Sequence, residues 1–350
     1  MMRNSIKILS VFLLSFGACS NNITKTPENE TTFNKFPLVQ LLEENEFMKF
    51  DTISPDGLFL YHDTLLIIRN KANSSKYHFS SINLNSRNFI SHHIESGYKT
   101  GQSLGFLSYG IVSSNLWVYD LNKQKIILSP LLLTDKKSDE SKELPLPVFY
   151  YSIQMDSDST LIGSGNYDSD FKLTRFNLST GKVLDELIPY HKAGSENPAR
   201  EEKMAYESFL CLKPSANKCV LACRYADQIE VFDLDTKKST IIKGPDGFGP
   251  EVDVVAGYEG KKMISRNNNT RFAAVSVKAT DNHIYVLFSG NREEETLPYY
   301  GKNIYVFDWD GAPVKKIALK DYINDFVVTS DDSRIYTFNP QTKLLKTAEI

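Results

Sequence analysis

The feature that most constrains this 350-residue chain is a repeated phrase: a short apolar or aromatic run, then Asp or Asn, then a turn and a second apolar run. An Asp or Asn side chain accepts hydrogen bonds from backbone N–H groups further along and starts the turn of a β-hairpin. Helical periodicity is scarce after residue 32, and only residues 198–209 are expected to form a short helix. Repeated hairpins predict an all-β fold. The copies of the phrase end at Asn83, Asp120, Asn177, Asp233, Asp308 and Asn339.

The spacing of these copies, roughly fifty residues, predicts a β-propeller of four-stranded antiparallel blades. The copies at Asn83, Asn177, Asp233 and Asp308 fit the hairpin between the third and the outer strand of blades one, three, four and five. The other two copies come earlier in their blades and fit the turn between the second and third strands of blades two and six. The fold expected is therefore a six-bladed β-propeller.

Blade six is one strand short, because only residues 344–349 remain to form a strand after the last copy. Residues 46–53 can supply the missing strand, so we expect the ring to be closed by an N-terminal strand. Closure leaves no open strand edge within the ring, which protects a β protein from aggregation. We assign residues 33–350 to the propeller.

Residues 1–18 have the features of a signal peptide. Arg3 and Lys7 form a positive head, residues 8–16 are apolar, and two small residues precede Cys19. The apolar run is shorter than the ~20 residues that span a bilayer. A cysteine directly after Phe-Gly-Ala resembles the lipobox of bacterial lipoproteins, which implies lipidation of Cys19 and cleavage before it. The alternative is an ordinary secretory signal with an incidental cysteine. Residues 19–32, rich in Thr, Asn and Glu, are expected to form a soluble tether.

Charge and cysteine content exclude several functions. A formal net charge of −3 gives no electrostatic reason to bind nucleic acid. Beyond the leader no segment is apolar enough to cross a membrane, so we expect membrane contact through the lipid anchor only. Cys211, Cys219 and Cys223 remain after lipidation, an odd number, so stability does not rest on a disulfide framework. We interpret them as small core side chains and leave open a disulfide from Cys211.

No catalytic, metal or cofactor site emerges from the sequence. The histidines have no metal-ligand spacing, and there is no Gly-x-Ser-x-Gly elbow. Asp156 with Asp158, and Asp168 with Asp170, alternate as in calcium loops but lack the remaining oxygen ligands, so turn formation is the better interpretation. We therefore assign no catalytic residue, metal or cofactor.

Five short turn and blade motifs lie between residues 204 and 339: residues 205–207, 226–233, 244–250, 300–302 and 306–311. Through these motifs, residues 204–339 resemble the TolB-like six-bladed propeller lipoproteins of Bacteroides and relatives. The resemblance implies the propeller fold and an extracytoplasmic location. It implies no reaction, because the family has no settled activity.

Loop lengths predict which face of the ring carries function. In such a blade, loops between blades and between the second and third strands share one face. The remaining turns share the other face. The first, named here the long-loop face, receives residues 97–105, 163–170, 189–206, 244–269 and 290–303. The second, the short-turn face, receives residues 214–217, 235–238, 280–282 and 330–333, and one long charged loop, 134–144, expected to be merely solvated. Long loops more often carry function.

We therefore expect a ligand site on the long-loop face, at the mouth of the central channel. Aromatic rings with amide and guanidinium groups suit flat polar ligands such as glycans or peptides. Turn formation, surface ion pairing and loop packing are the plain alternatives for these residue types. The candidate contacts are Arg224, Tyr225, Arg266, Asn267, Tyr299 and Tyr300.

The sequence thus favours a membrane-anchored binding or scaffold lipoprotein whose partner is an envelope protein or a polar ligand. The alternatives are a glycan-active lyase or hydrolase with its site over the channel, and a structural subunit of an envelope complex. We expect it in the cell envelope, at the outer membrane facing the periplasm, with the cell surface left open.

Overall fold

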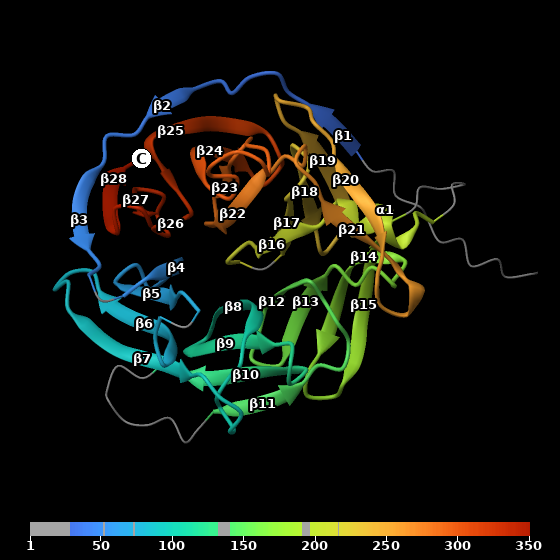
Figure 1. Ribbon diagram of the computed structural model, residues 1–350, viewed down its shortest axis with the longest axis horizontal. Coiled ribbons are helices and arrows are strands. Elements are labelled where there is room, and N and C mark those ends of the chain that lie inside the picture. The colour runs from blue at the N-terminus through green and yellow to red at the C-terminus, as the bar shows by residue number, and fades with distance from the viewer. Residues whose placement is uncertain (1–28, 52, 73, 132–140, 191–196, 216) are drawn as a thin grey trace, which may run out of the picture.

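The computed structural model describes residues 29–350 except 52, 73, 132–140, 191–196 and 216. The leader, Cys19, most of the tether and most of the charged loop at 134–144 lie outside the described residues. The described strands form seven sheets: six are blades arranged in a ring (Figure 1), and the seventh is a two-stranded hairpin. The predicted six-bladed β-propeller is confirmed.

Each blade is built on four antiparallel strands paired in series from an innermost strand to the rim. Blade one contains β4 (Pro55–Tyr61), β5 (Leu65–Asn70), β6 (Tyr77–Asn83) and β7 (Phe89–Glu95). Blade two contains β8 (Phe106–Val112), β9 (Asn115–Asp120), β10 (Lys125–Pro130) and β11 (Lys142–Pro145). Blade three contains β12 (Ser152–Met155), β13 (Thr160–Ser164), β14 (Phe171–Asn177) and β15 (Lys182–Pro189).

The later blades take strands from both ends of the chain. Blade four contains β16 (Ser208–Leu212), β17 (Lys218–Cys223), β18 (Gln228–Asp233) and β19 (Lys238–Lys243), with β1 (Asn29–Thr32) parallel to β19. Blade five contains β22 (Ala274–Ala279), β23 (His283–Phe288), β24 (Gly301–Asp308) and β25 (Pro313–Ile323), with β2 (Val39–Leu41) parallel to β25. Blade six contains β26 (Asp325–Val328), β27 (Arg334–Asn339), β28 (Leu344–Glu349) and β3 (Asn45–Lys49).

The N-terminal strand closes the ring as expected. β3 pairs antiparallel with β28, and Figure 1 shows the two strands side by side at the rim. The expected segment, residues 46–53, overlaps β3 but extends beyond its C-terminal end. Phe50, just after β3, is buried in the junction between blades six and one.

The six recurring Asp and Asn residues form the turns predicted for them. The Asp233 carboxylate, for example, accepts the backbone N–H groups of Asp235 at 3.1 Å and Thr236 at 2.7 Å. Hydrogen bonds of the same kind are accepted by Asn83, Asp120, Asn177, Asp308 and Asn339. The strand pairing also places each copy in its predicted hairpin within the blade.

The hydrophobic core is divided among the junctions between blades. Each pair of neighbouring blades, including six and one, encloses its own cluster of buried apolar side chains. The junction of blades four and five holds Trp309, Phe288 and Phe307, and Phe36 from the N-terminal segment joins them. Side chains at one junction therefore fix the angle between two blades and, through the ring, the shape of the channel.

A helix and a hairpin stand outside the blades, both within long loops. Helix α1 (Arg200–Ala205) lies before blade four and is shorter than the helix expected at residues 198–209. Strands β20 (Val252–Ala256) and β21 (Lys262–Arg266) form a separate hairpin in the loop between blades four and five. A short 3-10 turn, Tyr258–Gly260, joins these two strands. No helix within the described residues is long and apolar enough to cross a membrane.

Candidate functional site

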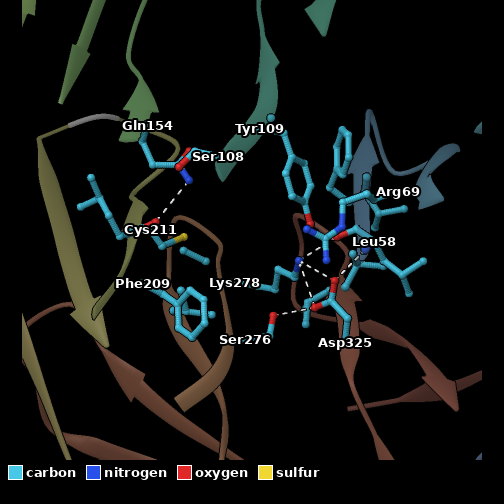
Figure 2. A pocket seen from close by; sticks show the side chains of 18 of the residues that line it. Leu58, Arg69, Ser108, Tyr109, Gln154, Phe209, Cys211, Ser276, Lys278 and Asp325 are labelled. Carbon is cyan, nitrogen blue, oxygen red and sulfur yellow. Dashed lines mark hydrogen bonds and ion pairs between the residues drawn. The ribbon is translucent and has the colours of Figure 1, made fainter. Parts of the chain in front are cut away.

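A cavity of about 1010 Å³ occupies the central channel. The innermost strands β4, β8, β12, β16, β22 and β26 all contribute to its lining, so every blade faces it. Figure 2 shows Gln154, Phe209 and Cys211 on one side and Tyr109, Arg69 and Asp325 on the other. At the long-loop end the lining includes residues from loops, which form the mouth of the channel.

A buried ionic cluster joins blades one, five and six inside the channel (Figure 2). The Asp325 carboxylate accepts hydrogen bonds from the Leu58 backbone N–H at 2.6 Å and from the Ser276 hydroxyl at 2.5 Å. The Lys278 ammonium lies 3.2 Å from the same carboxylate and donates to the Leu58 carbonyl at 2.7 Å. Because these residues meet where the ring closes, the cluster has a structural role there.

A second ion pair lies beside this cluster. The Arg69 guanidinium donates to the Asp56 carboxylate at 2.8 Å and lies 5.1 Å from the centre of the Tyr109 ring. Burial disfavours the charged guanidinium, but Tyr109, Asp56 and Asp325 outweigh this effect and raise the pKa of Arg69. Arg69 is therefore a fixed positive charge on the channel wall.

The remaining acidic side chains of the described lining also have partners. Asp63 accepts the Ser330 backbone N–H at 3.0 Å, and Asp281 accepts the Ser215 backbone N–H at 2.9 Å. Both bonds connect turns of neighbouring blades on the short-turn face. A carboxyl group that acts as a general acid or base in a hydrolase or lyase must be positioned for proton transfer to the substrate. The acids of this channel instead hold parts of the protein together.

At the channel mouth, Arg224 is the centre of a polar and aromatic cluster. Its guanidinium lies 2.6 Å from the Glu207 carboxylate and donates to the Tyr151 hydroxyl. It also lies 5.3 Å from the centre of the Phe209 ring and 5.4 Å from that of Tyr225. Burial disfavours the charge, but the neighbouring Tyr151, Tyr225 and Glu207 raise the pKa of Arg224.

Arg266 and Tyr299 form the adjoining part of the mouth. The Arg266 guanidinium donates to the Tyr299 hydroxyl and lies 3.5 Å from the Glu293 carboxylate. The Tyr299 ring packs edge-on against Phe272 with 4.6 Å between ring centres. Tyr299 remains 36% exposed, so it offers a ring edge and face to an incoming molecule.

The structure therefore brings most of the predicted residues together, in different roles. Three of them line the channel cavity: Arg224, Tyr299 and Tyr300. Arg266 lies outside this lining and donates a hydrogen bond to the Tyr299 hydroxyl. Tyr225 is only 5% exposed and packs against Phe272, behind the surface. Asn267 forms a turn, since its side chain accepts the Asn269 N–H at 2.9 Å.

Four residues of the mouth were missed by sequence reasoning: Tyr151, Glu207, Phe272 and Glu293. Phe272 contacts both Tyr225 and Tyr299 and is 1% exposed, so it supports the aromatic surface from beneath. Glu207 lies within a motif of the family resemblance but carries no local sign of its partner. Its pairing with Arg224 could be predicted only by knowing that the start of β16 lies beside the end of β17.

The cysteines and histidines form no metal site within the described part of the chain, where no group of three or more His, Cys, Asp or Glu side chains is arranged to hold an ion. Cys211, Cys219 and Cys223 are free thiols, so the disulfide left open for Cys211 is not formed. Cys219 and Cys223 are buried core side chains, as predicted, whereas Cys211 lines the channel. Burial raises the pKa of Cys211 to about 12, which keeps this thiol protonated.

Comparison with known proteins identifies the family. The family model described as "TolB-like 6-blade propeller-like" matches residues 49–331. This chain belongs to the TolB-like six-bladed propeller family. The resemblance predicted from the sequence motifs is thus confirmed, over a longer stretch than the motifs covered.

Two solved structures from Bacteroides have a similar fold to this TolB-like chain. One is a Bacteroides fragilis protein provisionally described as exported, with a TM-score of 0.52 and 12% identity, covering 92% of this chain and 98% of that one. The other is a DUF4221 family member from Bacteroides vulgatus. Its TM-score is also 0.52 and its identity 12%, and the match covers 88% of this chain and 98% of that one. At this identity the likeness concerns the fold alone. No curated protein sequence matches this chain.

Two motifs of the TolB-like resemblance meet in space beside the mouth. The buried Asp227 carboxylate accepts the backbone N–H groups of Asp246 at 2.7 Å and Gly247 at 3.0 Å. A side chain at Gly244 would lie 2.1 Å from this carboxylate, so only glycine fits there. Burial raises the pKa of Asp227, but these N–H groups oppose the shift. Asp227 therefore holds the start of the 244–269 loop in place, which makes these residues structural markers of the TolB-like fold.

Proposed function

We propose that this protein is a membrane-anchored, extracytoplasmic binding protein that captures a polar ligand with flat faces, such as a glycan or peptide segment, at the long-loop mouth of the channel. The observation that carries the proposal is the mouth itself, where Tyr299, Tyr300 and Arg224 line one opening above a cavity of about 1010 Å³. Tyr and Arg are the residues most often found at the centre of binding surfaces.

The chemistry of the channel supports binding rather than catalysis. Its acidic side chains Asp56, Asp63, Asp281 and Asp325 each bond to a neighbouring protein group. Both arginines of the mouth are ion-paired, Arg224 with Glu207 and Arg266 with Glu293. Such pairs hold the donors in a fixed geometry, which lowers the entropy lost when a ligand binds.

The extracytoplasmic, anchored location rests on two further observations. The sequence of residues 1–19 has the pattern of a lipoprotein leader. A Bacteroides fragilis protein of similar fold is provisionally described as exported. We propose the outer membrane, facing the periplasm, as the site of the anchor.

The test combines a glycan array, a peptide library and capture from envelope extracts, with wild type and variants immobilised through the C-terminus. Tyr300→Ala and Tyr299→Ala should weaken capture by about tenfold each, because aromatic anchors at a mouth contribute most of the binding free energy. Lys237→Ala is the matched control. Lys237 is an exposed side chain on the short-turn face, paired with Asp185 at 2.8 Å, and its loss should leave capture unchanged.

Hydrogen exchange with the captured partner locates the site. Protection across residues 290–303 and 266–272 is expected. Protection confined to residues 235–238 and 330–333 would place the binding site on the opposite face and contradict the proposal. Conversion of a captured glycan into shorter or unsaturated products would contradict the proposed binding function and indicate a glycan-cleaving enzyme instead.

A further inference from the structure

A second cavity, of about 470 Å³, lies between blades three and four. Among the described residues it shares no lining residue with the central channel. Strands β13 and β14 contribute to one side, β17, β18 and β19 contribute to the other, and α1 adds Glu202 and Lys203. Its volume lies within the range of ~300–1,000 Å³ that is typical of small-molecule sites.

Much of the wall is aromatic or aliphatic. The rings of Tyr167, Tyr190 and Tyr206 line it, together with Leu221 and Ile241. Tyr167 is 6% exposed, and its hydroxyl has no hydrogen-bond partner. A buried hydroxyl without a partner is uncommon in a closed protein core. Such walls favour an occupant with an apolar body and at least one oxygen atom.

Lys203 supplies a buried positive charge to this cavity. The residue is 6% exposed, its ammonium donates to the Ser169 carbonyl at 2.8 Å, and it lies 5.0 Å from the centre of the Tyr190 ring. Burial lowers the pKa of Lys203, and the more distant carboxylates of Asp170 and Asp168 oppose this shift. A buried ammonium is unfavourable unless an anion accompanies it.

The other lysines of the wall differ from Lys203 in their partners. Lys172 lies 3.0 Å from the Glu230 carboxylate, and Lys243 lies 2.7 Å from that of Glu30. Glu202, beside Lys203 in the chain, is directed to the start of α1, where it accepts the Ala199 N–H at 3.0 Å. No ion pair among the described residues involves Lys203, so its ammonium has donors left for a ligand.

We propose that this cavity binds a small organic carboxylate with an apolar or aromatic body, whose carboxylate group pairs with the Lys203 ammonium. The body of the ligand packs against Tyr190, Tyr206 and the aliphatic wall. This site is separate from the channel mouth and does not depend on the function proposed for it.

Isothermal titration of the intact propeller with phenylacetate, 3-phenylpropionate and hexanoate tests the proposal, and phenylacetamide serves as the uncharged probe. At least one carboxylate should bind at millimolar concentration or below, and phenylacetamide should bind at least about tenfold more weakly, as expected for loss of a charged hydrogen bond. This comparison uses wild-type protein alone, so it holds even if a variant fails to fold.

Lys203→Met keeps the aliphatic stem and removes the charge, and it should weaken carboxylate binding by about tenfold or more. Lys237→Met, which lies outside both cavities, is the matched lysine control, and Tyr300→Ala is the control from the channel mouth; neither should change the affinity by more than about threefold. The proposal is overturned if none of the carboxylates binds at millimolar concentration, if phenylacetamide binds equally well, or if folded Lys203→Met protein binds like wild type. Loss of glycan or peptide capture in Tyr300→Ala with carboxylate binding retained would separate the two sites.

Discussion

Single carboxylates connect the blades of this propeller on the short-turn face. Asp332, in the turn between β26 and β27, accepts hydrogen bonds from the Thr280 hydroxyl at 2.7 Å and the Tyr285 hydroxyl at 2.8 Å, and from the Asn282 amide at 2.9 Å. Burial disfavours its charge, but these donors outweigh burial and lower the pKa of Asp332. One residue of blade six thus fixes the first turn of blade five.

A buried histidine makes the stability of blade one depend on pH. His93 is 6% exposed, its Nε2 lies 3.0 Å from the Ser81 hydroxyl, and burial, assisted by His92, lowers its pKa to about 4. In the unfolded chain the imidazole takes a proton near pH 6.5. Between these two values the unfolded state binds more protons, so the free energy of unfolding falls as the pH falls. Between pH 7 and pH 5, protonation of this group should lower the free energy of unfolding by about 2 kcal/mol.

Urea unfolding of wild type and His93→Gln at both pH values measures this contribution. The variant should lose about 2 kcal/mol less than wild type on acidification, whatever its stability at pH 7. An identical loss in both proteins would show that other groups control the acid sensitivity.

How much the sequence could predict at the residue scale depended on the range of each interaction. The turns at Asn83 and Asp233 were predictable because donor and acceptor lie within three residues of each other. Asp325 and Lys203 were not, since their partners and surroundings come from other blades or loops that no local pattern connects. The same reason explains why Arg224 was a candidate and its partner Glu207 was not.

At the scale of elements, the N-terminal segment adds three strands with unequal roles. β1 and β2 lie parallel on the outer edges of blades four and five, which already have four strands each. β3 is the fourth strand of blade six, and it pairs with β28. On the channel side, Asp325 and Leu58 join blades six and one at the same junction. Ring closure therefore rests on contacts at both the rim and the channel.

Removing residues 344–350 should lower the free energy of unfolding by several kcal/mol, a large share of the ~5–15 kcal/mol typical of a domain. The truncation deletes β28, leaves β3 without its partner and exposes Leu345, which is fully buried in the junction between blades six and one. A truncation that begins at Phe33 and so deletes β1 is the control. It should cost no more than about 1–2 kcal/mol, because residues 30–32 are exposed and blade four stays complete. Thermal unfolding compares the three proteins, and equal melting temperatures for wild type and the C-terminal truncation would contradict closure through β28.

Other elements show where sequence patterns stop being informative. The hairpin of β20 and β21 was expected only as part of a long loop, because it pairs within itself and belongs to no blade. The cavity between blades three and four was also missed, because its lining comes from β1, α1 and strands of two blades. The ring, by contrast, was predictable, since repetition of one local phrase specifies it.

At the scale of the whole molecule, strand direction relates the tether to the two faces. The turn between β18 and β19 lies on the short-turn face, so β19 runs from that face toward the long-loop face. β1 is parallel to β19 and therefore begins nearer the short-turn face. Asn29 lies ten positions after Cys19 in the sequence, and at ~3.3–3.6 Å per residue this stretch spans at most about 35 Å. If Cys19 carries the anchor, the tether enters the propeller from the short-turn side, which favours an orientation in which the mouth with Tyr299 and Tyr300 faces away from the membrane.

Cys19→Ser should release the protein from membranes into the soluble fraction. Several acyl chains at ~0.8 kcal/mol per buried methylene hold a lipoprotein practically permanently, and the described propeller has no membrane-spanning helix to replace them. Cys211→Ser is the matched control, because it removes a thiol from the channel wall and should leave the protein in the membrane fraction. Fractionation with mass spectrometry of the mature N-terminus makes the measurement. A Cys19→Ser protein that stays with the membrane, or wild-type protein that begins at a residue other than acylated Cys19, would refute the anchor. It would also remove the reason for expecting the long-loop mouth to face away from the bilayer.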